Sequence, residues 1–186
     1  MSRKKKLRII HIERHGEPVR MQIEPHRYDD QRIYFFRETG IELPPMDELK
    51  KIGNPEYLRA LMRRVYLRVY LSDGRWFAWE FLPGFVWDLA SVPKFFRWAI
   101  DNDDPFLAEA ALVHDANYTG HFLGDNLPGI GMTNWLFREM VRATGKRARA
   151  QIAYMAVNSI IGRSLYWKAT KRESTLQFVK FSFGTF

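Results

Sequence analysis

The sequence predicts an α+β fold, in which a small antiparallel β-sheet is followed by a bundle of helices. Two observations predict it: an alternating strand pattern at residues 65–71 is followed by a turn signal and a second, aromatic strand, and most of the chain after residue 90 has helical spacing with capping signals. The 186 residues, of which 46% are hydrophobic, suit one globular domain of ordinary size.

The β-hairpin is the clearest element. In RVYLRVYLSDGRWFAWEF, the apolar residues Val65, Leu67, Val69 and Leu71 alternate with Tyr66, Arg68 and Tyr70. Asp73-Gly74 then supplies the positive φ angles of a tight turn before a second, aromatic strand. We therefore expect a hairpin over residues 64–82. Pro83-Gly84 ends its second strand, and residues 85–87 suit a third short strand.

The first 60 residues are richer in turn signals than in regular patterns. Strand-like runs at Leu7 to Ile12 and Ile33 to Phe36 are separated by breaker-rich segments. We expect residues 1–60 to form a basic arm or an added layer, residues 61–170 the α+β domain, and residues 171–186 an aromatic C-terminal strand or tail. The tail TLQFVKFSFGTF suits either addition to a neighbouring subunit or packing on its own sheet.

Capping signals predict four helices. Ser91 is an N-cap candidate for the first, with Pro93 in its first turn, and Asp104-Pro105 begins the second, which runs through Tyr118. Thr133 is the N-cap candidate for the third helix, which Gly145 ends. The fourth is expected from about Lys146 to Trp167, with a buried face made of Ile152, Met155, Ala156, Ser159 and Ile160.

The net charge of +8 favours acidic partners such as nucleic acid, an anionic surface or an acidic protein. The cations are spread along the chain without a recognisable nucleic-acid motif, so a solvated basic surface is the simpler interpretation. The apolar run near the N-terminus is too short for a membrane span or a signal-peptide core. The absence of cysteine leaves only His, Asp and Glu as strong metal ligands.

His114 and Asp115 place two polar side chains inside an apolar predicted helix. His114 shares its helix face with apolar residues, so we expect it to point inward. A buried carboxylate such as Asp115 must be paired, hydrogen-bonded or bound to a metal, because an isolated buried charge is very costly. Asp88, before the turn into the first predicted helix, is the candidate to meet this pair. The shared face carries Leu107, Ala110, Ala111 and Tyr118.

Two interpretations of these residues stay open. In one, Asp88, His114 and Asp115 are catalytic groups or ligands of a divalent metal. In the other, they form a structural network in which His114 is a hydrogen-bonded core histidine and Asp88 caps the LASVP turn. His121 lies in the glycine-rich stretch TGHFLGDNLPGIG, which suits a ligand loop or an ordinary long connection.

Three ordered motifs, GFVWDLASVPKFFRW, AALVHDANYTG and TNWLFREMVRATG, resemble the phage and prophage family called domain of unknown function 1353 over about residues 64–165. At the third motif the family usually has an aspartate where this chain has Asn134, and an amide lacks the charge of a carboxylate ligand. A site that needs that aspartate would be weakened here. The resemblance marks Asp88, Ser91, Pro93, His114, Asp115 and Tyr118; together, Ser91, Tyr118, His121 and Asn134 are the candidate binding residues.

The resemblance implies a phage gene product without an established activity. The favoured hypothesis is a virion-associated protein of the tail, neck or capsid, or an accessory protein, found in the host cytoplasm during assembly and in the virion. Its expected partners are other phage structural proteins, nucleic acid through the basic surface, and further copies of itself. The alternative is a metal-dependent hydrolase, acting for example on cell wall, with His114 as base or ligand and Asp115 and Asp88 as ligands or orienting groups. No cofactor other than a divalent metal is suggested.

Overall fold

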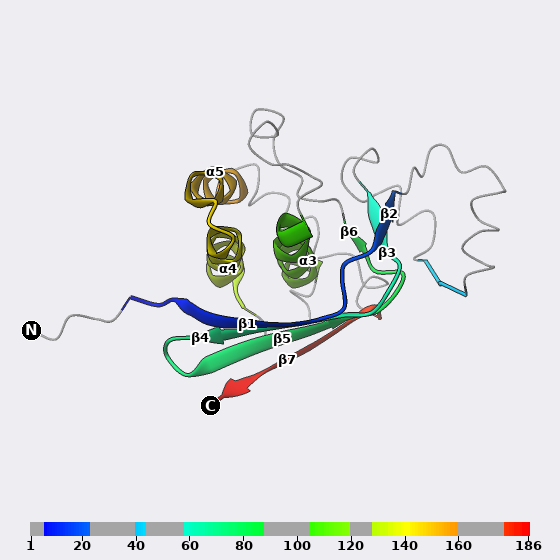
Figure 1. Cartoon of the computed structure of the whole chain (residues 1–186), viewed down its shortest axis with the longest axis horizontal. Coiled ribbons are helices and arrows are strands. Elements are labelled where there is room, and N and C mark those ends of the chain that lie inside the picture. Colours follow the sequence, from blue (N-terminus) through cyan, green and yellow to red (C-terminus); the bar gives the residue numbers. More distant parts are fainter. Residues whose placement is uncertain (1–5, 23–39, 44–57, 88–104, 120–127, 160–176) are drawn as a thin grey trace, which may run out of the picture.

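The computed structural model describes residues 6–22, 40–43, 58–87, 105–119, 128–159 and 177–186. In these residues a four-stranded antiparallel sheet, in the order β1-β4-β5-β7, lies against a layer of helices, and a smaller sheet has the order β2-β3-β6 (Figure 1). The predicted α+β class is confirmed.

The predicted hairpin forms the centre of the larger sheet. Strands β4 (Val65–Leu71) and β5 (Arg75–Phe81) pair antiparallel, from Val65 opposite Phe81 to Tyr70 opposite Trp76. In the turn, Gly74 has a φ of 90° and its N–H donates to the Leu71 carbonyl at 3.1 Å. The turn chemistry read from Asp73-Gly74 therefore decides where the strands reverse.

Segments from both ends of the chain complete this sheet. Strand β1 (Ile9–His15) pairs with β4, and strand β7 (Val179–Thr185) pairs with β5. Part of the segment expected as a basic arm thus lies within the main sheet. The C-terminal segment packs on the protein's own sheet, which is one of the two arrangements that its sequence suits.

The smaller sheet is built from three short strands. Strand β3 (Arg59–Leu61) lies in the middle, between β2 (Arg20–Gln22) and β6 (Val86–Trp87). Strand β6 corresponds to the third short strand expected at residues 85–87. It contacts α3 and ends one residue before Asp88 in the sequence.

Among the described residues, three helices form the layer above the larger sheet: α3 (Pro105–Thr119), α4 (Ile130–Ala143) and α5 (Arg147–Val157). Helix α3 has the predicted extent. Helix α4 begins earlier than expected, and the prediction that Thr133 is its N-cap is wrong, because the N-cap is Gly129. Thr133 is instead buried in the first turn, where its hydroxyl donates to the Pro128 carbonyl at 3.0 Å.

The buried face of α5 also differs from the prediction. Met155, which was expected on the buried face, is 55% exposed, whereas Ala156 is buried as expected. The other buried positions are Ala150, Ala153 and Val157. Alanines thus make up most of the buried face of α5, so alanine spacing marks this face better than the larger Ile152 and Met155 do. The helix ends at Val157, not near Trp167, and residues 158–159 follow as a turn and a bend.

The main core lies between the larger sheet and the helices. Aromatic side chains from β5, β6 and α4 fill it together with the aliphatic face of β4 and the alanine-rich face of α3. The helix predicted after Ser91 lies outside the described residues. Among the described helices, none has the length and apolar character needed to cross a membrane. The largest fully buried side chains include Trp79, Trp87, Phe81, Phe85 and Phe137.

Candidate functional site

His114 lies on the buried side of α3, as its spacing predicts. It is 6% exposed, and its expected neighbours on the helix face, Leu107, Ala110, Ala111 and Tyr118, are buried too. The aromatic ring of Tyr118, one turn along α3, has its centroid 4.0 Å from that of His114, and the Phe137 ring from α4 lies at 5.0 Å. The imidazole is therefore held between side chains of two helices.

Asn134 on α4 is the centre of the polar network around His114. Its Oδ1 lies 3.2 Å from His114 Nε2 and accepts a hydrogen bond from the Tyr118 hydroxyl at 2.8 Å. Its Nδ2 donates to Asn158 Oδ1 at 2.9 Å and to the Val157 carbonyl at 3.5 Å. Asn134 is fully buried, and it links α3 to the end of α5.

The hydrogen-bond partners assign the orientation of the Asn134 amide. The Val157 carbonyl can only accept, so Nδ2 faces it and Oδ1 faces His114 and Tyr118. His114 Nε2 must then donate a proton to Oδ1. A carboxylate could not replace this amide without losing both donors toward α5.

The second ring nitrogen of His114 faces Asp115. Nδ1 lies 3.2 Å from Asp115 Oδ1, in a pair whose side chains are 7% and 18% exposed. Both ring nitrogens of His114 thus have a partner within the protein.

The other predicted site residues cannot be compared with this arrangement. Asp88, Ser91 and His121 lie outside the described residues, so the expectation that Asp88 meets the His114-Asp115 pair stays a prediction. In the described part of the chain, no group of three or more His, Cys, Asp or Glu side chains is placed to hold a metal ion. The metal site predicted from Asp88, His114 and Asp115 also needs Asp88, which lies outside the described residues.

Three buried or partly buried polar contacts were not predicted from the sequence. Asn158 completes the Asn134 network just after α5. Asn117 Oδ1 on α3 accepts from Trp79 Nε1 on β5 at 2.8 Å. Glu109 on α3, whose side chain is 9% exposed, pairs with Arg14 on β1 at 2.7 Å. A signal for Asn117 was available in the sequence, because it is a polar residue one turn from His114 on a mostly apolar helix.

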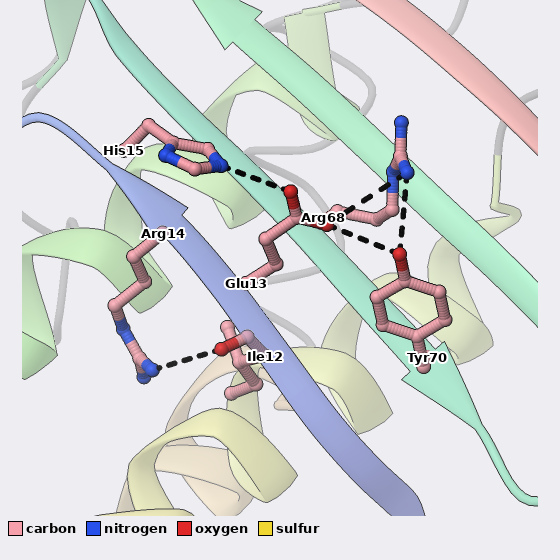
Figure 2. A network of polar contacts seen from close by, with 6 residues as sticks. All are labelled: Ile12, Glu13, Arg14, His15, Arg68 and Tyr70. Atoms are coloured by element: carbon pink, nitrogen blue, oxygen red, sulfur yellow. Dashed lines mark hydrogen bonds and ion pairs between the residues drawn. The ribbon is translucent and has the colours of Figure 1, made fainter.

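A second polar network covers the opposite face of the sheet (Figure 2). Glu13 on β1 lies opposite Arg68 on β4 in the register; its carboxylate contacts His15 Nε2 at 2.9 Å and accepts from the Tyr70 hydroxyl at 3.1 Å. The hydrogen bond with His15, followed by that with Tyr70, lowers the pKa of Glu13 below its ordinary value. Arg68 lies 3.7 Å from Glu13 and 4.7 Å from the centre of the Trp76 ring.

The described chain is thus an α+β domain whose three helices are joined by a buried network around a histidine and an asparagine. Residues 67–157, from β4 to the end of α5, match the family model described as "Protein of unknown function (DUF1353)", and this part of the chain is a domain of that family. No curated protein and no solved structure matches the chain.

Proposed function

We propose that the protein is a virion-associated or accessory protein of a phage, in which the His114 network stabilises the helix layer and carries no catalysis. The observation that supports this is the state of the imidazole: it is buried, and its two nitrogens are engaged by Asn134 and Asp115. A general base or a metal ligand needs a nitrogen that can reach a substrate, a water molecule or a metal.

Asn134 adds to this argument. Its amide donates to α5 while accepting from α3, so it meets the hydrogen-bonding needs of three helices at once. A buried polar network in which the members satisfy one another rigidifies a core. The resemblance to a phage and prophage family, together with the net charge of +8, supports a role alongside acidic partners such as nucleic acid or phage structural proteins.

The alternative is a metal-dependent hydrolase that uses Asp88, His114 and Asp115. It is favoured by one observation, the contact of 3.2 Å between His114 Nδ1 and Asp115, because carboxylates commonly orient a histidine whose other nitrogen binds a metal. In that mechanism Nε2 would have to leave Asn134 and lose its proton before binding a metal. The hydrogen bond to Asn134 opposes this change.

Two measurements test the proposal together. We expect purified protein to contain much less than one equivalent of any divalent metal by elemental analysis, and intact purified particles to contain the protein by mass spectrometry. His114→Gln serves as the matched variant for the metal measurement, since it keeps a polar side chain of similar length. One equivalent of metal in the parent protein that is lost in His114→Gln, with the protein absent from particles, would favour the hydrolase instead.

A further inference from the structure

Strand β7 is an outer strand of the larger sheet and pairs with β5 along one edge (Figure 1). Its other edge has no partner strand among the described residues. Lys180, Ser182, Phe183 and Thr185 are exposed, and Phe183 is 50% exposed although it is a large apolar side chain. An exposed strand edge with apolar side chains favours pairing with another strand.

Backbone hydrogen bonds show which groups point away from the sheet. The Phe186 N–H donates to the Gly74 carbonyl at 2.9 Å, and the Phe178 carbonyl accepts from the Leu82 N–H at 2.8 Å. Because backbone groups alternate between the two edges of a strand, the even-numbered residues bond to β5. The odd-numbered residues, from Val179 to Thr185, direct their N–H and C=O groups outward.

The side chains of the same odd-numbered residues face the helix layer. Phe181 lies opposite Trp79 and Phe183 opposite Phe77 in the register. The Phe77 and Phe181 rings are stacked at 6.1 Å, and so are the Phe181 and Phe183 rings. A row of aromatic rings therefore begins in the core and ends, half exposed, at the open edge.

We propose that β7 pairs antiparallel with β7 of a second copy of this chain, about a two-fold axis at Ser182. This register uses the whole strand and places Phe181 opposite the partner's Phe183 as a hydrogen-bonded pair. The two-fold axis repeats this contact, so Phe183 also lies opposite the partner's Phe181. The dimer therefore has two aromatic pairs, which cover the exposed rings. The two sheets become one continuous sheet with the helices on the same side.

The charges of β7 suit a second copy of the strand. Lys180 lies opposite the partner's Gly184, and Ser182 lies opposite itself, so no like charges face each other. Lys180 also keeps its own counter-charge, because Glu80 on β5 lies 3.5 Å away. A strand that is complementary to itself favours a two-fold homodimer over an unrelated partner.

A cysteine substitution tests both the contact and its register, since the natural chain has no cysteine. In the proposed dimer the two Ser182 residues form a non-hydrogen-bonded pair with Cα atoms about 4.5 Å apart, which suits a disulfide. We expect Ser182→Cys to oxidise mainly to a covalent dimer. Lys180→Cys, on the same strand and face, places its sulfurs about 13 Å apart and should remain mainly monomeric on denaturing gels.

A non-covalent test uses Phe183. Its N–H points outward, so Phe183→Pro removes one intermolecular donor and an aromatic ring without removing a bond to β5. We expect sedimentation to show a dimer for the full chain and a dissociation constant raised at least about tenfold in Phe183→Pro. A monomeric parent protein, or equal crosslinking of Ser182→Cys and Lys180→Cys, would overturn the proposal; the crosslinking result decides if Phe183→Pro does not fold.

Discussion

On the helix side of the sheet, His114, Tyr118 and Asn134 are almost completely buried, whereas Glu13 and Arg68 on the opposite face remain partly exposed. Both networks contain a histidine, a carboxylate and a tyrosine hydroxyl that donates to an oxygen. The two networks differ in their access to water. On the face of the sheet opposite the helices, here called the open face, water competes for every hydrogen bond. We therefore expect burial, rather than the kind of residue, to decide how much each bond stabilises the fold.

The largest expected effect is at His114. His114→Ala should lower the free energy of unfolding by about 2–4 kcal/mol, because it opens a cavity and leaves Asn134 Oδ1 with one donor fewer. His15→Ala on the open face is the matched control and should change it by about 0.5 kcal/mol or less. Equilibrium urea denaturation measures both variants. Equal effects would remove the distinction between the two networks, and wild-type stability of His114→Ala would favour the catalytic interpretation.

Asn134→Asp tests the importance of the amide. The aspartate cannot donate to the Val157 carbonyl or to Asn158, and it adds a buried charge, so we expect a loss of about 1–3 kcal/mol. Asn158→Asp is the control, because Asn158 only accepts from Asn134 and keeps this ability as a carboxylate. Denaturation at neutral pH compares them. An Asn134→Asp variant more stable than the parent would show that the site is built for a carboxylate.

The two tyrosines allow the same chemical change on each face. Tyr118→Phe removes the buried hydrogen bond of 2.8 Å to Asn134 and should cost about 1 kcal/mol. Tyr70→Phe removes the bond of 3.1 Å to Glu13 on the open face and should cost about half of that or less. Thermal and urea unfolding of the pair measures the difference. A larger cost for Tyr70→Phe would reverse the ranking of the networks.

The smallest effect concerns the pH dependence of the open network. Since hydrogen bonds from His15 and then Tyr70 lower the Glu13 pKa, its contribution to stability is present above the ordinary value of 4.5 and is lost as the pH falls through the lowered pKa. His15→Ala should raise the Glu13 pKa more than Tyr70→Phe does. A carboxyl NMR titration of the three proteins measures this. An unchanged Glu13 pKa in both variants would contradict the assigned cause.

Local patterns in the sequence were sufficient for several elements. The hairpin follows from alternation along β4 and the turn signal Asp73-Gly74, and the inward position of His114 follows from helical spacing on α3. Such signals depend on a few consecutive residues, so they can be interpreted without knowing which residues become neighbours in the folded protein. The spacing of α5 was less informative, because alanine on one face and larger residues on another both have helical period.

The partners of the polar residues were decided only by the tertiary structure. Asn134 lies 20 residues from His114 and 24 from Asn158, and Arg14 lies 95 residues from its partner Glu109. No short-range pattern links such positions, since their meeting depends on how α3, α4 and α5 pack and on which strands pair. The sequence by itself determined that a buried histidine and a carboxylate needed partners, because unpaired polar groups are costly in a core. Packing then brought the amide of Asn134 to His114, and this contact favours a structural network over a charged site.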